Sequence, residues 1–179
     1  MSYKWDLLAL LVGLALIGYQ VIMYIRTKVP IVMSPKKYID TLLLDLKKDI
    51  STDLVVMEMG SAWANFSFAM EKMGVKNITA YELSPLHVVC CRLKAKYLQS
   101  KIIFKQEDFF QADISVAQLI YVFLVPSVVG RLWLKIKKEC QPGTIMILLG
   151  HELSGEQYFR KIKTNPYKEK STYFYFYKV

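Results

Sequence analysis

The chain has 179 residues, of which 54% are hydrophobic, and it carries a formal net charge of +9. This length suits one domain of ordinary size and excludes an array of several large domains. Three cysteines, two of them adjacent (Cys90 and Cys91), are too few for a disulfide framework, and no Cys-x-x-Cys spacing indicates zinc. We therefore expect three buried cysteines and no bound metal.

Residues 7–25 form an uncharged and mostly apolar run. A helix of about 19 residues, with a rise of about 1.5 Å each, just covers a hydrocarbon core of roughly 30 Å. Trp5 and Tyr24 suit the membrane interface. We predict a single transmembrane helix, with residues 1–28 as the membrane anchor. The alternatives are a cleaved signal peptide, which would have a shorter apolar region and a small-residue cleavage site, and a buried core helix.

Basic residues are distributed unevenly around this span. Lys4 precedes it, whereas Arg26, Lys28, Lys36 and Lys37 follow it. The positive-inside rule then predicts a single-pass membrane protein with its C-terminal domain on the cytoplasmic or mitochondrial matrix side. Basic side chains beside an anchor also predict attraction to an anionic membrane surface, at about 1 kcal/mol for each well-placed one. No nucleic-acid-binding motif occurs, so we expect no nucleic-acid partner.

A connecting segment, residues 29–49, follows the anchor. Its prolines favour extended backbone in the residues before them. Ser34 and Pro35 suit the N-cap and the first position of a helix. We predict that this helix continues to about residue 48 with one apolar face, formed by Tyr38, Ile39, Leu42, Leu43 and Leu46.

Residues 50–179 alternate between strand patterns and helix patterns. The predicted strands cover residues 54–59, 78–82, 102–105, 119–125, 144–149 and 172–179. The predicted helices cover residues 63–73, 85–100 and 128–140, with a short helix near Ser115. Strands separated by helices of this length imply a parallel sheet. The last strand has no helix before it, which indicates an antiparallel edge strand.

The ends of two predicted strands carry acidic residues. Glu58 precedes the break at Gly60, and Glu82 ends the next strand a little more than about 20 residues further on. A doubly wound sheet holds an adenosine ribose with this series of elements: a strand, a tight turn, a helix and, at about this distance, an acidic strand end. The turn, however, has Ala62 and Ala64 where a nucleotide-binding loop prefers glycine.

The order of these motifs resembles that of the class I S-adenosylmethionine (SAM)-dependent methyltransferases. The resemblance is greater to the membrane-anchored FAM173-like protein lysine methyltransferases. The matching elements are Val29-Pro30 to Pro35, Glu58-Met59-Gly60-Ser61, Tyr81-Glu82-Leu83-Ser84-Pro85, Asp108-Phe109 and Val125-Pro126. The resemblance implies an α/β Rossmann-like methyltransferase sheet in residues 50–179. It also implies SAM as the methyl donor and a protein lysine of a membrane-associated substrate as the acceptor.

The resemblance assigns a set of donor-binding residues at the carboxyl ends of the first three strands. Glu58 would hold the ammonium of the donor, Gly60 would let the backbone approach its methionine part, and Glu82 would accept from both ribose hydroxyls. An alternative for Glu82 is a cap on the following helix. The full set is Glu58, Gly60, Ser61, Ala62, Glu82, Leu83, Asp108 and Phe109.

The adenine end of the donor would contact three of these residues. Asp108 would accept a hydrogen bond from the adenine amino group, and Leu83 and Phe109 would lie on the two sides of the ring. The alternative for Asp108 is a solvated loop acid.

The chain departs from the family where Gly-Asp-Gly is replaced by Ala62-Trp63-Ala64. Alanine at the second glycine position of the loop, Ala62, can function if φ stays negative, although it narrows the approach to the ligand. Trp63 could cover the donor or fill its site. No general base is evident, so the catalytic residue stays unassigned. We expect a structural role for His87 and no role for His151. Methyl transfer needs alignment with a deprotonated amine, and proximity supplies much of the acceleration.

Two other functions are compatible with the sequence. The altered turn favours a degenerate methyltransferase fold that acts as a membrane-tethered interaction module without activity. The anchor and the aromatic C-terminal strand favour methylation of a lipid or another small amphiphile.

Overall fold

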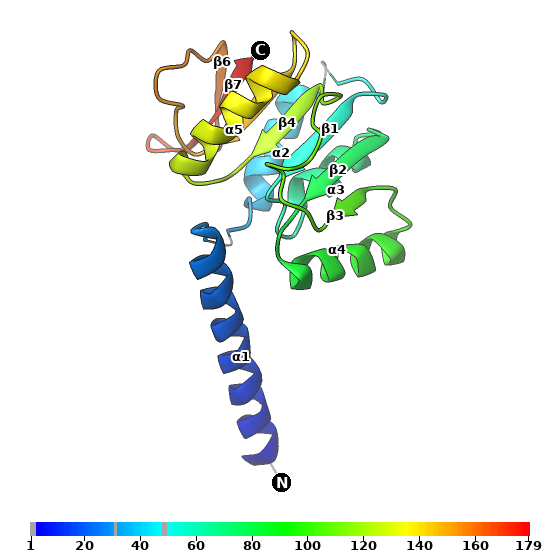
Figure 1. Cartoon of the computed structure of the whole chain (residues 1–179), viewed down its shortest axis with the longest axis vertical. Helices are drawn as coiled ribbons and strands as arrows, with labels where there is room; N and C mark the ends of the chain where they lie inside the picture. Colours follow the sequence, from blue (N-terminus) through cyan, green and yellow to red (C-terminus); the bar gives the residue numbers. More distant parts are fainter. Residues whose placement is uncertain (1–2, 31, 48–49) are drawn as a thin grey trace. The chain divides into compact units, whose positions relative to one another are not determined.

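A computed structural model describes residues 3–30, 32–47 and 50–179 of the chain. The chain divides into two compact units, Met1–Val32 and Met33–Val179. The first unit contains the helix α1 (Tyr3–Thr27), drawn in blue in Figure 1. From Lys4 to Thr27 this helix is long enough and apolar enough to cross a membrane.

The second unit is built on one seven-stranded sheet. Its strands follow the order β3-β2-β1-β4-β5-β7-β6. The first five strands are parallel, and β7 is antiparallel to both β5 and β6. This confirms the predicted α/β Rossmann-like sheet, mostly parallel with an antiparallel strand at one end. The bounds are β1 (Val55–Met59), β2 (Asn77–Tyr81), β3 (Ile103–Lys105), β4 (Leu119–Val122), β5 (Ile145–Leu149), β6 (Arg160–Lys163) and β7 (Tyr173–Lys178).

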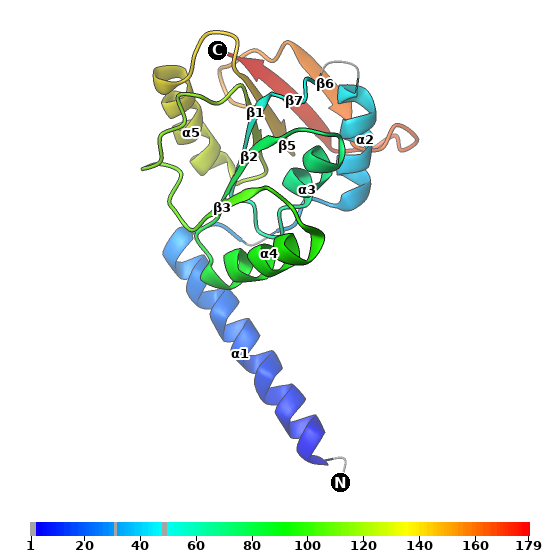
Figure 2. The same cartoon turned by 90° about the vertical axis from the view of Figure 1, so that its right-hand side faces the viewer.

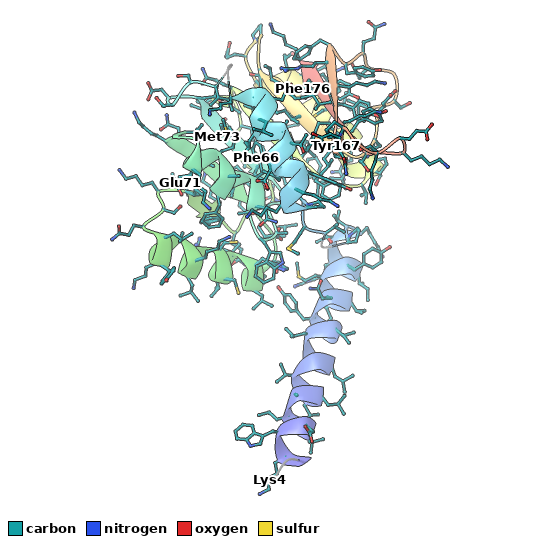
Figure 3. The ribbon with its side chains drawn as sticks, turned by 180° about the vertical axis from the view of Figure 1, so that it is seen from behind. Lys4, Phe66, Glu71, Met73, Tyr167 and Phe176 are labelled. Atoms are coloured by element: carbon teal, nitrogen blue, oxygen red, sulfur yellow. The ribbon has the colours of Figure 1, made fainter. Side chains whose placement is uncertain are left out.

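Helices cover both faces of the sheet (Figure 2). Apolar side chains of α2 (Lys36–Leu46), α3 (Asn65–Lys72) and α4 (Pro85–Leu98) pack on one face, and those of α5 (Pro126–Glu139) pack on the other. Figure 3 views the unit from the α2 and α3 side and labels Phe66, which is completely buried. Successive residues of β4 alternate between the two cores, and all four are buried, as expected for a central parallel strand.

The start of α4 follows its local sequence. Ser84 is the N-cap, its hydroxyl accepts from His87 N–H at 3.3 Å, and Pro85 occupies the first turn. This confirms the predicted cap.

The predicted cap at Ser34 is wrong. Pro35 is the N-cap of α2 and makes no side-chain cap bond. The Ser34 hydroxyl instead lies 2.8 Å from the Tyr121 hydroxyl, so a tertiary partner has replaced the local one. The predicted end of this helix at residue 48 and the segment end at residue 49 lie outside the described residues.

Two further differences concern the second half of the chain. The predicted short helix near Ser115 is wrong, because residues 115–116 form a turn in which Ser115 N–H donates to Asp113 Oδ1 at 2.9 Å. An aspartate side chain that accepts a hydrogen bond from the backbone N–H two residues later competes with helix formation. The edge strand β6 was missed, since its basic residues hide the alternation that marks a strand.

Candidate functional site

The turn after β1, residues 60–64, lies where a doubly wound sheet normally binds its ligand. Such ligands sit outside the carboxyl ends of the strands, at the point where strand order reverses. Here the order reverses between β1 and β4. The N–H groups of Gly60 and Ser61 both donate to the carbonyl of Tyr81, at 3.0 and 2.8 Å. The turn is thereby held against the end of β2.

Gly60 satisfies two geometric demands of this turn. Its φ is +72°, in the left-handed region that favours glycine. A Cβ at this position would lie 2.8 Å from Cδ2 of Leu124. The turn therefore approaches the residues that follow β4 closely. Sequence reasoning missed Leu124, because one leucine in an apolar run carries no distinguishing signal.

The two alanines of the turn adopt the conformation that glycine would adopt. Ala62 has φ +45° and Ala64 has φ +54°. The condition that we set for Ala62, a negative φ, is not met. A left-handed conformation costs an L-residue roughly 1–2 kcal/mol. Such strain persists only where surrounding contacts hold the backbone in place.

Glu82 is one of the groups that hold the turn. Its Oε2 accepts from Ala62 N–H at 2.8 Å and its Oε1 accepts from Ser84 N–H at 2.8 Å. The half-buried carboxylate thus faces the turn and also supports the start of α4. Because each carboxylate oxygen can accept more than one hydrogen bond, Glu82 keeps acceptor capacity for a ribose diol. The roles as cap and as ligand are compatible.

Trp63 lies against the first turn of α4. Its indole meets the His87 ring edge-on, with the ring centroids 4.9 Å apart, and 39% of the residue is exposed. His87 is buried, and its Nδ1 lies 2.7 Å from the Ser84 hydroxyl. Burial lowers the pKa of His87, so the imidazole is neutral near pH 7. The pair supports the turn from the α4 side.

Ser61 contributes a buried hydroxyl to the turn. Its hydroxyl oxygen is buried and makes no hydrogen bond to the described residues. Buried hydroxyls are usually paired. Together with the Glu82 carboxylate, this hydroxyl gives the turn a polar donor and acceptor set that fits a ligand such as SAM.

Glu58 is engaged with α3. Its Oε2 accepts from the Ser67 hydroxyl at 2.6 Å and from Ser67 N–H at 3.0 Å. Burial raises the pKa of Glu58 from 4.5 to about 7, against the lowering effect of these two bonds. Contact of Glu58 with the ammonium of a donor stays a prediction. Sequence reasoning missed Ser67, which reaches Glu58 only through the packing of α3 on β1.

The raised pKa of Glu58 predicts a pH-dependent stability. Between about pH 4.5 and 7 the unfolded carboxyl is ionised and the folded one is not, so stability falls as pH rises, by ~3 kcal/mol in total. Glu58→Gln should remove this fall while keeping an acceptor for Ser67. Urea unfolding at pH 5 and pH 7.5 measures it. Glu71→Gln on α3 should leave the fall unchanged; an equal fall in both variants contradicts the assignment.

The residues assigned to the adenine differ in exposure. Leu83 is 40% exposed, whereas Phe109 is only 7% exposed. The Phe109 ring packs against Phe110 in the core, with the ring centroids 4.8 Å apart. Asp108 is half-buried, and its Oδ1 accepts from Phe110 N–H at 3.0 Å. Leu83 is thus available to cover a ring, whereas Phe109 is almost completely buried.

His151 directly follows Gly150 at the carboxyl end of β5. Its Nε2 is buried without a hydrogen-bond partner among the described residues, and burial lowers its pKa. The imidazole is therefore neutral near pH 7. No catalytic residue is assigned on this basis.

Several solved structures with the same fold are SAM-dependent methyltransferases. An RNA methyltransferase from Salinibacter ruber, in complex with S-adenosylhomocysteine, is similar over 83% of this chain and 94% of its own, with 26% identity and a TM-score of 0.72. The magnesium protoporphyrin IX methyltransferase of Synechocystis PCC 6803, with bound SAM, is similar over 79% of this chain and 77% of its own, with 12% identity and a TM-score of 0.64.

A third similar structure is a ribosomal protein L11 methylase from Lactobacillus delbrueckii subsp. bulgaricus. It covers 82% of this chain and 80% of its own, with 12% identity and a TM-score of 0.65. These three enzymes are named for RNA, a porphyrin and a protein, so the fold alone does not define the acceptor. Curated protein sequences give no match to the chain.

The fold, the turn after β1 and these similarities define a class I SAM-dependent methyltransferase, with SAM as its methyl donor. Residues 58–158, more than half of the chain, match the family described as the ANTKMT methyltransferase domain. The chain belongs to this family.

Proposed function

We propose that this methyltransferase transfers a methyl group from SAM to a lysine of a membrane-associated protein. The observation that carries the donor half of the proposal is the Glu82 carboxylate, which faces the turn after β1 and bonds Ala62 N–H at 2.8 Å. The lysine acceptor is proposed from the resemblance to the FAM173-like enzymes. The membrane location of the substrate is proposed from α1.

The residues of the site would divide the binding of SAM among them. Glu82 would accept from the ribose hydroxyls, Asp108 from the adenine amino group, and the Ser61 hydroxyl would bond a polar group of the methionine part. SAM supplies a methyl group on a sulfonium sulfur, which makes that carbon electrophilic. The lysine amine must arrive neutral, and its proton can leave to water before the attack. The chain then contributes mainly alignment of the two reactants.

The membrane part of the proposal rests on α1 and on the residues that follow it. The helix from Lys4 to Thr27 is long enough and apolar enough to cross a membrane, so it would insert in a bilayer. Lys28, Lys36 and Lys37 would then lie on the cytoplasmic or matrix side and attract anionic headgroups. The anchor would restrict the enzyme to encounters with substrates at the same surface.

The proposal is tested with the full chain in its native membranes. Membranes that contain the wild-type chain or Glu82→Ala are incubated with methyl-labelled SAM, and lipid is then separated from protein. We expect label in the protein fraction, recovered as methyllysine after hydrolysis, and its loss in Glu82→Ala. Label in lipid alone would show a lipid methyltransferase. Absence of label, together with no SAM binding at millimolar concentration, would show an interaction module.

A further inference from the structure

The segment that enters the methyltransferase unit, residues 33–35, is bonded to the donor-binding side of the sheet. Ser34 is 8% exposed. Its carbonyl accepts from Asn65 Nδ2 at 2.9 Å, and its hydroxyl lies 2.8 Å from the hydroxyl of Tyr121. We call residues 33–35 the junction segment, because they follow the unit that contains α1.

Both partners of Ser34 lie beside the turn after β1. Asn65 is the first residue of α3 and directly follows Ala64, the strained N-cap. Tyr121 of β4 is buried and stacks on Phe66, with ring centroids 4.1 Å apart and an interplanar angle of 13°. The junction segment is therefore attached at the point where the turn becomes α3.

The attachment matters because the turn is strained. Two non-glycine residues with positive φ raise its energy, so external contacts must select this conformation. Tyr81 and Glu82 hold the first part of the turn from the β2 side. Asn65, which directly follows the turn, bonds the Ser34 carbonyl and so ties the last part of the turn to the junction segment.

We propose that the junction segment controls SAM affinity, with Ser34 and Asn65 as positioning residues that keep the turn in its donor-binding conformation. Neither residue needs to touch the donor. The proposal links the junction segment, which directly follows the unit that contains α1 in the sequence, to the donor site. This inference does not depend on which acceptor is methylated.

Such a link must act in both directions. If the junction segment favours SAM binding, SAM binding must stabilise the attachment of the segment by the same free energy. Addition of SAM to the wild-type protein should therefore slow amide exchange in residues 33–38 as well as in the turn.

The test is Asn65→Ala in the full chain, purified in nanodiscs. Loss of one net hydrogen bond should weaken SAM binding about fivefold in calorimetry and speed amide exchange of residues 60–66 without donor by a similar factor. The maximal rate of methyl transfer should change less than about twofold, because the acceptor and its alignment are untouched. SAM should no longer protect residues 33–38.

Asn77→Ala is the matched control. The Asn77 Nδ2 donates to the Asp53 carbonyl at 3.0 Å, but this bond lies at the amino ends of β1 and β2, away from the turn. This variant should leave SAM affinity and exchange in the turn at wild-type values. Asn65→Asp keeps the shape of the side chain and suits a helix start, but it removes the N–H group that donates to the Ser34 carbonyl. Amide exchange in the turn should therefore again be faster. Ser34→Ala tests the bond to Tyr121 in the same assay. Equal exchange and equal affinity in the Asn65 and Asn77 variants would overturn the proposal.

Discussion

Glu82→Ala should weaken SAM binding by at least about 100-fold. The carboxylate now holds Ala62 N–H and Ser84 N–H, and we expect it also to accept from the ribose diol. Charge-assisted hydrogen bonds contribute roughly 1.5–3 kcal/mol each, so the loss of two corresponds to a factor of about 100 or more. Isothermal titration of the full chain with SAM measures the change.

A second carboxylate provides the control for this result. Glu71 Oε1 also accepts a hydrogen bond from a backbone N–H, that of Lys101 at 2.6 Å, but Lys101 precedes the amino end of β3 rather than following the carboxyl end of a strand. Glu71→Ala should bind SAM with wild-type affinity. Glu82→Gln, which keeps one acceptor oxygen, should fall between the wild type and Glu82→Ala. Unchanged affinity in Glu82→Ala would remove Glu82 from the donor site.

Gly60→Ala should lower the free energy of unfolding by about 1–3 kcal/mol and SAM affinity at least about tenfold. An alanine at position 60 would have to adopt φ +72°, and its Cβ would lie 2.8 Å from Leu124 Cδ2. The first effect costs roughly 1–2 kcal/mol, and the second displaces Leu124 or the turn itself. Urea unfolding and calorimetric titration measure the two quantities.

The reverse exchange two residues later should have the opposite effect on stability. Ala62→Gly removes the energetic cost of φ +45° at this residue. Part of this gain is offset, because glycine has greater conformational freedom in the unfolded chain. We expect a gain of about 0.5–1 kcal/mol. Ala69→Gly, within α3, should instead lose about 1 kcal/mol, the ordinary penalty in a helix. A loss of the same size at Ala62 would show that its left-handed conformation is wrong.

Six of the seven strands of the sheet were predictable, because their signals are local. Apolar runs with the lengths of strands alternate with helix patterns, and Ser84 with Pro85 marks the start of α4 within two residues. The acidic residue Glu82 was predictable for the same reason, since its position depends only on where β2 ends. The structure adds that its carboxylate bonds the turn.

The parts of the site that escaped prediction depend on contacts between distant residues. Ser34 looks like a helix cap in the sequence, but its hydroxyl lies next to Tyr121, 87 residues further along the chain. Leu124 becomes important only because β4 pairs with β1 and brings it over Gly60. Local propensity gives no information on such pairs, which are decided by packing.

The sequence alone was sufficient for most of the strands and helices, the long apolar helix and the acidic residue after β2, because hydrophobic periodicity and turn chemistry act over a few neighbouring residues. Only the tertiary structure decided that Ala62 and Ala64 take glycine-like angles, that Glu58 bonds Ser67, and that Asn65 holds the junction segment. Backbone angles in a turn and the partners of buried polar groups depend on what surrounds them in space. These are the features that determine how firmly the turn is held for SAM.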